Sequence, residues 1–147
     1  MNNKEISEGC KEMSKLIIDD KDFISSGIDI EKLDYSLESL KYIEKIITKI
    51  RKQTKNIEYY NKVILRFGSY LGEVIIKESK NAYEWMVYEE SVEINSELSK
   101  YGKNILTIFT LHHNKKTILF PMVKIDKYLR HGKQDSLHFY AKVIENR

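Results

Sequence analysis

The sequence contains little proline, glycine or cysteine, and it has no long apolar run. One proline and six glycines in 147 residues leave few positions that favour turns, so we expect few long loops. The single cysteine, Cys10, cannot form an intramolecular disulfide, which favours a reducing compartment. No apolar stretch approaches the roughly 20 residues of a membrane-spanning helix, and the charged first residues do not resemble a secretory signal. We therefore expect a cytoplasmic protein that does not contact a membrane.

The motifs of common cofactor and catalytic sites are also missing. The only close glycine pair, Gly68 and Gly72, lies within a helical pattern, whereas phosphate-binding loops need glycines between a strand and a helix. Zinc sites need closely spaced cysteine and histidine, but Cys10 is far from every histidine in the sequence. Structural or solvent-exposed roles are expected for the four histidines, which are His112, His113, His131 and His138. These absences predict no metal, no cofactor and no catalytic residue, and hence a protein that is not an enzyme.

Charge is divided unevenly along the chain, although the formal net charge is only +3. Residues 1–99 carry 15 basic and 19 acidic side chains, while residues 100–147 carry 10 basic and 3 acidic ones. Such asymmetry can mark a polar partner or an anion site. It also arises when solvated helix faces happen to differ.

Hydrophobic periodicity predicts that helices make up most of the chain. Apolar residues recur at steps of three and four over residues 4–18, 35–53 and 57–79. Cys10 falls on the first of these stripes, so we expect it to be a small buried side chain. Pro121 is well placed to begin a further helix through Arg130, and a last helix is expected after Asp135 or Ser136.

Period-two alternation predicts the strands. It occurs at residues 83–88 and 105–112, and a hairpin turn at His113–Lys116 leads to a returning strand at 117–120. Ile28 and Ile30 suggest a short early edge strand. The polar stretch 89–100 is expected to be a loop or a short exposed turn of helix.

These elements predict an α+β fold, with a three- or four-stranded, mainly antiparallel sheet packed by four or five helices. Residues 1–147 are expected to form a single domain. Within it, residues 1–32 hold an N-terminal helix and an irregular segment, and residues 33–147 hold the core.

The helix at residues 57–79 contains a feature that needs an explanation. Two glycines inside a helix cost about 1 kcal/mol each relative to alanine, yet Gly68 and Gly72 are four residues apart and share one face. They form a groove without side chains, which another helix, a sheet or a ligand can approach closely. Glu73 follows the groove and is either a partly desolvated carboxylate of a site or an exposed partner of Lys77.

Three segments resemble a loose group of small bacterial proteins of unestablished function. They are Asp34–Leu40, Phe67–Val74 with the later Trp85, and Pro121–Leu137. In that group a D-x-S-x-E-S-L helix precedes a G-x-Y-x-G-E-V helix and a tryptophan-bearing strand. Some small domains of this general kind serve as immunity proteins or as accessory proteins of toxins. The resemblance implies no catalytic activity and no catalytic residue.

Three functional hypotheses follow, and the oligomeric state stays open. The first is a protein-interaction domain, of the immunity type or accessory to a toxin, that binds a protein partner through an acidic surface formed by Glu84, Glu89, Glu90, Glu93 and Glu97. The second is a nucleic-acid-associated protein that uses a basic surface formed by Lys115, Lys116, Lys124, Lys127, Arg130 and Lys133. The third is a small-molecule site or unrecognised enzyme in a pocket formed by Gly68, Gly72, Glu73 and Trp85.

Overall fold

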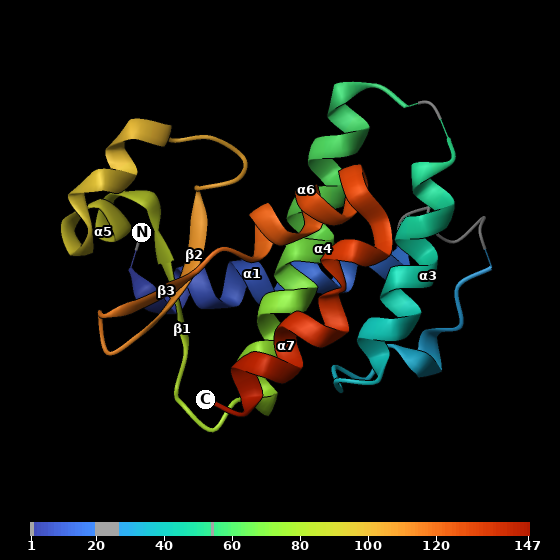
Figure 1. The fold of residues 1–147 in the computed structure, drawn as a ribbon, viewed down its shortest axis with the longest axis horizontal. Helices are drawn as coiled ribbons and strands as arrows, with labels where there is room; N and C mark the ends of the chain where they lie inside the picture. Colours follow the sequence, from blue (N-terminus) through green and yellow to red (C-terminus); the bar gives the residue numbers. More distant parts are fainter. Residues whose placement is uncertain (1, 20–26, 54) are drawn as a thin grey trace.

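The computed structural model describes residues 2–19, 27–53 and 55–147. Within them the chain forms a single α+β domain in which helices dominate and a small sheet lies at one end (Figure 1). The α-helices are α1 (Asn3–Asp19), α3 (Ser39–Arg51), α4 (Ile57–Glu78), α5 (Tyr88–Ile94), α6 (Pro121–His131) and α7 (Leu137–Glu145). The strands are β1 (Glu84–Val87), β2 (Phe109–His113) and β3 (Thr117–Leu119), and the 3-10 helices are η1 (Ile30–Lys32), η2 (Ser96–Tyr101) and η3 (Gly132–Asp135).

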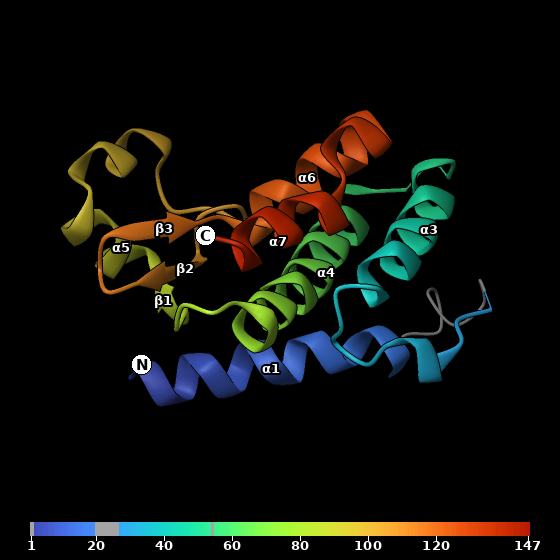
Figure 2. The same cartoon turned by 60° about the horizontal axis from the view of Figure 1, so that its bottom comes forward.

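Helix α4 is the centre of the fold. It packs against α1, α6 and α7 (Figures 1 and 2), and several of its faces are therefore buried. Val63, Phe67, Leu71 and Val74 are all fully buried. Its first residue, Ile57, is 71% exposed, although it belongs to the predicted apolar stripe.

Protein side chains fill the groove along Gly68 and Gly72. A Cβ atom at Gly72 would lie 2.1 Å from Cζ2 of Trp85, and one at Gly68 would lie 3.0 Å from Sδ of Met122. The glycines thus let the indole of β1 and the first turn of α6 lie directly on the backbone of α4. The free energy gained by this close packing offsets the low helix propensity of the two glycines.

The sheet is antiparallel with the order β1-β2-β3, so β2 is central. Trp85 pairs with Leu111 on one face and Met86 pairs with Thr110 on the other, and all four side chains are buried. Helix α5 packs against β1 and β2, so the face of β1 that carries Met86 is covered rather than solvated.

The β2–β3 turn confirms the predicted hairpin. Asn114 and Lys115 both have positive φ (52° and 56°), and the Lys116 N–H donates to the carbonyl of His113 at 3.1 Å. Two central residues of positive φ match the right-handed twist of the strands that they join.

Two predicted elements differ from the structure. Residues 30–32 form the 3-10 helix η1 instead of an early edge strand. Of the two alternatives for residues 89–100, a loop or a short exposed turn of helix, the structure has the helical one, because they hold most of α5 and η2. The predicted strand at 105–112 begins only at Phe109, because Asn104 and Thr107 close a tight turn before it. Residues 20–26 of the predicted irregular segment lie outside the described residues.

The junction between α6 and α7 is fixed from α3. Gly132 ends α6 with a φ of +73°, a conformation that favours glycine. Arg51 of α3 donates from Nε to the carbonyl of Leu129 (2.9 Å) and from Nη2 to that of Arg130 (3.2 Å). A Cβ at Gly132 would lie 2.5 Å from this guanidinium. Ser136 then caps α7 by accepting from the N–H of Phe139 at 3.2 Å.

Candidate anion-binding groove

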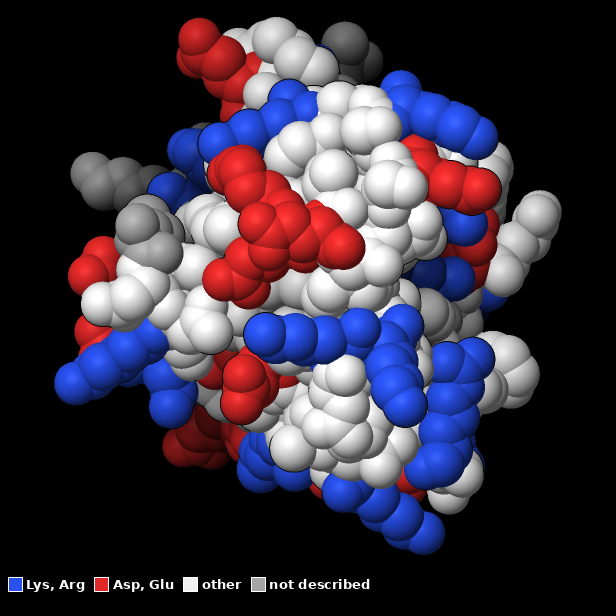
Figure 3. All heavy atoms as spheres, turned by 90° about the vertical axis from the view of Figure 1, so that its left-hand side faces the viewer, with Lys and Arg blue, Asp and Glu red and all other residues white. Residues whose placement is uncertain are grey.

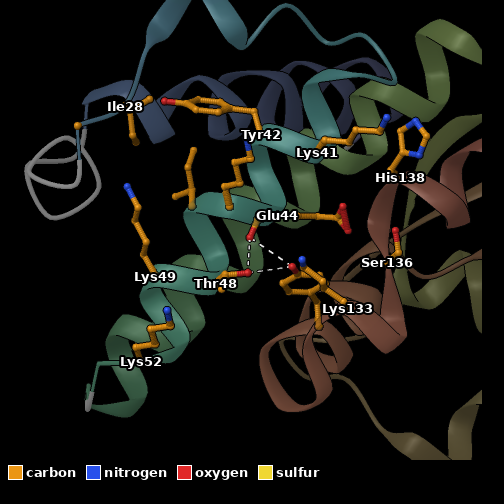
Figure 4. A pocket seen from close by; sticks show the side chains of 14 residues that line it. Ile28, Lys41, Tyr42, Glu44, Thr48, Lys49, Lys52, Lys133, Ser136 and His138 are labelled. Atoms are coloured by element: carbon orange, nitrogen blue, oxygen red, sulfur yellow. Dashed lines mark hydrogen bonds between the residues drawn. The ribbon is translucent and has the colours of Figure 1, made fainter.

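An open groove of about 730 Å³ lies along α3. We call it the lysine groove, because five of its lining residues are lysines and one is an acid. It is lined by Gly27, Ile28, Lys41, Tyr42, Glu44, Lys45, Ile46, Thr48, Lys49, Lys52, Tyr128, Lys133, Ser136 and His138. In Figure 4, Lys133, Ser136 and His138 lie on one flank of α3, and Ile28 lies on the other flank beside Tyr42.

The amphipathic pattern of α3 places four lysines on the groove. Ile43, Ile47 and Ile50 are buried against the core, which fixes the rotation of the helix. Lys41, Lys45, Lys49 and Lys52 are spaced by four, four and three residues, so they share one exposed face. The same face forms a wall of the groove, which distinguishes it from an ordinary solvated helix surface.

The opposite flank is held in place by the α6–α7 junction. Lys133 lies in η3, directly after Gly132, and Ser136 and His138 lie at the start of α7. Because Arg51 holds the end of α6 and sits against Gly132, the position of this flank is tied to α3.

The floor of the groove contains a chain of hydroxyl groups. Thr48 Oγ1 and Tyr128 Oη are 2.9 Å apart, and both donate to the carbonyl of Glu44, at 2.7 and 3.3 Å. Burial is the main reason that the pKa of Tyr128 is raised, so this phenol stays a neutral hydrogen-bonding group. The Glu44 carboxylate accepts from the N–H of Leu137 at 3.1 Å, at the N-terminus of α7. The one acid among the described lining residues thus already accepts a hydrogen bond from the backbone.

Three lysines of the groove form no ion pair within the described part of the chain: Lys45, Lys52 and Lys133. Lys41 pairs with Glu38 at 3.3 Å, but both side chains are more than half exposed (55% and 75%), so the pair contributes little. His138 lies 3.6 Å from the same carboxylate. The positive charge is therefore least compensated at two places, which are the C-terminal half of α3 and η3.

The groove has an apolar end beside its cationic stretch. Tyr42 and Ile28 are half-buried there, and the Tyr42 hydroxyl accepts from the N–H of Asp29. The Lys32 ammonium lies 5.2 Å from the centre of the Tyr42 ring. A ligand that combines anionic groups with a flat apolar part matches this arrangement.

The pocket predicted around the glycines is a packed contact between helix and strand. Trp85 covers Gly72 and donates from Nε1 to the half-buried carboxylate of Glu73 at 2.8 Å. Cys10 lies in the same part of the core, where burial and then the charge of Glu73 raise the pKa of its thiol to about 12. Two small hollows flank this contact, one touching Trp85 and the other Glu73, but neither reaches the glycines.

The predicted acidic residues lie at the sheet end of the molecule. Glu84 is in β1, Glu89, Glu90 and Glu93 are in α5, and Glu97 is in η2. Glu89 pairs with Lys103 at 3.3 Å. Figure 3 shows a group of adjoining acidic side chains on this face, with basic side chains beside and below it. The structure thus gives no uniformly acidic surface on the face drawn there.

The predicted basic residues do not gather in one patch. Lys115 and Lys116 are in the β2–β3 turn, while Arg130 and Lys133 are near the end of α6, at the other side of the molecule (Figures 1 and 2). Lys124 pairs with Asp135 at 3.2 Å, and Arg130 pairs with Asp126. Lys127 is exposed on α6. Of the six, Lys133 alone lines the lysine groove.

The described residues contain no group of three or more histidine, cysteine, aspartate or glutamate side chains that could hold a metal ion. In the same part of the chain, no helix has the length and apolarity to cross a membrane.

Comparisons of the chain with family models, with curated proteins and with solved structures give no match. The resemblance inferred from the three sequence segments therefore stays a prediction.

Proposed function

We propose that this protein acts by binding a phosphate-bearing ligand in the lysine groove. The observation that carries the proposal is the presence of Lys45, Lys52 and Lys133 around one groove without an ion pair among the described residues. Like charges that converge on a hollow repel one another, and an anion relieves this repulsion. The volume of about 730 Å³ falls in the range of small-molecule and cofactor sites.

The chemistry of the cations favours phosphate. The described lining residues supply positive charge through lysine, while Arg51 is turned towards the carbonyls of α6. Lysine binds phosphate as a point charge, whereas paired recognition of a carboxylate favours the fork of arginine. Ser136, on the same flank as Lys133, adds a hydroxyl group.

The test is a titration of the ¹⁵N-labelled protein with tripolyphosphate at low salt, followed by amide chemical shifts. We expect shift changes confined to residues 41–52 and 132–138. In the variant K45E/K52E/K133E the affinity should fall at least about tenfold, as expected when several charged contacts of about 1 kcal/mol or more are reversed.

The matched control is K80E/K100E/K116E, which changes the net charge equally at three exposed lysines outside the groove. The control should keep its affinity, and both variants should unfold like the parent protein to within about 0.5 kcal/mol. If no shifts occur, or if the two variants lose affinity equally, the groove is not an anion site.

The protein-interaction hypothesis for the acidic residues stays a separate prediction. It is tested by pull-down from the host with the variant E89K/E90K/E93K. Retention of the same partner by this variant would remove the acidic surface from the hypothesis.

A further inference from the structure

We propose that the ligand of the lysine groove is single-stranded nucleic acid, with its phosphodiester backbone lying along α3. This inference rests on the proposed phosphate-binding function and specifies its ligand.

The lysines of α3 form a row rather than a cluster. Lys41 and Lys52 are eleven residues apart, which is about 17 Å along a helix at about 1.5 Å per residue. A compact anion could contact only part of such a row. Stacked nucleotides place one phosphate about every 3.4 Å along the axis of the helix that they form. At most about five phosphates therefore fall within the length of the row, and fewer do so in an extended strand.

Lys133 adds a cation from the opposite flank. It lies in η3 on one flank of α3, while Lys49 extends towards Ile28 on the other flank (Figure 4), so a strand that lies over the exposed face of α3 has positive charge on both sides. The exposed pair between Lys41 and Glu38 is weak enough for Lys41 to exchange its partner for a phosphate.

The apolar end of the groove favours a strand with unpaired bases. Sites for single strands combine a cationic groove with aromatic side chains on which bases stack. Tyr42 supplies an aromatic ring beside the lysines, and Ile28 adds an apolar side chain next to it. In a duplex the bases are stacked and paired with each other, so they cannot reach these two side chains.

The inference is tested by fluorescence anisotropy with labelled DNA and RNA oligonucleotides of two to twelve nucleotides. Affinity should rise with length up to about five nucleotides and then level off. With about four phosphates neutralised, the affinity should fall about 50-fold between 50 and 200 mM salt. Unlabelled duplex DNA, poly-glutamate and tripolyphosphate serve as competitors, and each should compete at least about tenfold more weakly than a single strand.

Variants of Tyr42 distinguish the contribution of base stacking to the affinity from that of charge. Y42A should weaken oligonucleotide binding about fivefold or more, as expected for the loss of one stacked base. Y42F loses only the hydroxyl that accepts from Asp29 and should keep the affinity. Both variants should bind tripolyphosphate like the parent protein.

The outcomes distinguish the two proposals. Tight tripolyphosphate binding without a gain from longer strands would overturn the nucleic-acid inference and leave the phosphate site standing. Equal competition by poly-glutamate would indicate an acidic protein segment instead, and equal competition by duplex would exclude a single-strand site. If none of the probes binds, the proposed function itself fails.

Discussion

Gly72 leaves no room for a side chain. A methyl group there would lie 2.1 and 2.3 Å from two ring carbons of Trp85, and the ring is 2% exposed. The indole is held by its hydrogen bond to Glu73 and by burial on β1. The ring therefore has little room to move away.

We predict that G72A destabilises the protein by about 1–3 kcal/mol, because overpacking outweighs the gain in helix propensity. Urea unfolding measures the change. The matched control is G9A, at an exposed position of α1 where the added Cβ meets nothing within 4 Å. That control should stabilise by about 0.5–1 kcal/mol. A G72A protein as stable as G9A would contradict the contact with Trp85.

The glycine pair also shows what the sequence can reveal about single residues. The spacing of Gly68 and Gly72 predicts a close approach to α4, and the structure has one at each glycine. Nothing in the spacing tells whether a strand, a helix or a ligand makes that approach, because the partners Trp85 and Met122 are distant in sequence. Cys10 was more predictable, since its place on an apolar stripe already indicated burial.

Among the elements, α6 and η3 are joined by a charged contact centred on Asp135. Its carboxylate lies 2.8 Å from Nδ1 of His131 and 3.2 Å from the ammonium of Lys124. The hydrogen bond from His131, followed by that from Lys124, lowers the pKa of Asp135 below its ordinary value.

A lowered native pKa makes the contribution of Asp135 to stability depend on pH. The contribution is fully present above the pKa of the unfolded carboxyl, about 3.9, and is lost as the pH falls through the lower native pKa. We predict that the difference in unfolding free energy between the parent protein and D135N is larger at pH 5 than at pH 2.5. Urea unfolding at both values measures it, and a difference that grew in acid would have the wrong sign for this contact.

The elements were predictable where hydrophobic periodicity is long. Helices α1, α4 and α6 occur close to their predicted positions, because each has a stripe of buried side chains or a clear start and stop. Helix α5 was predicted only as one of two alternatives, because it is short and Ser91 is its one buried residue. Strand β2 starts late because the side chains of Asn104 and Thr107 hold the preceding backbone in a turn.

The candidate site could be predicted only in part. The lysines at 41, 45, 49 and 52 are visible in the sequence at helical spacing, but the same spacing is typical of a solvated helix face. The groove exists because Lys133 and the start of α7 come to lie beside α3, and this contact joins segments about ninety residues apart. Local patterns carry no information about such a contact.

For the whole molecule, one hydrophobic cluster joins the helical part to the sheet. It includes Ile6 of α1, Ile47 of α3, Phe67 of α4, Trp85 of β1 and Ile144 of α7. Since this one cluster joins described residues of the helical part to the sheet, the fold should unfold as a unit.

We predict that Trp85 fluorescence and far-UV circular dichroism report the same unfolding midpoint in urea. The chain has one tryptophan, so the fluorescence reports on the contact between β1 and α4, while the dichroism reports on all helices. Two separated transitions would indicate that the sheet end and the helical part unfold independently.

Arg51 has a consequence for the timing of ligand capture. Its guanidinium joins α3 to the end of α6, next to Gly132 and Lys133, so the two flanks of the lysine groove are connected before a ligand arrives. A site shaped in advance spends little of the binding free energy on ordering itself. Capture then becomes a matter of diffusion guided by the field of the lysines, which salt slows, while the residence time is set by the contacts made after arrival.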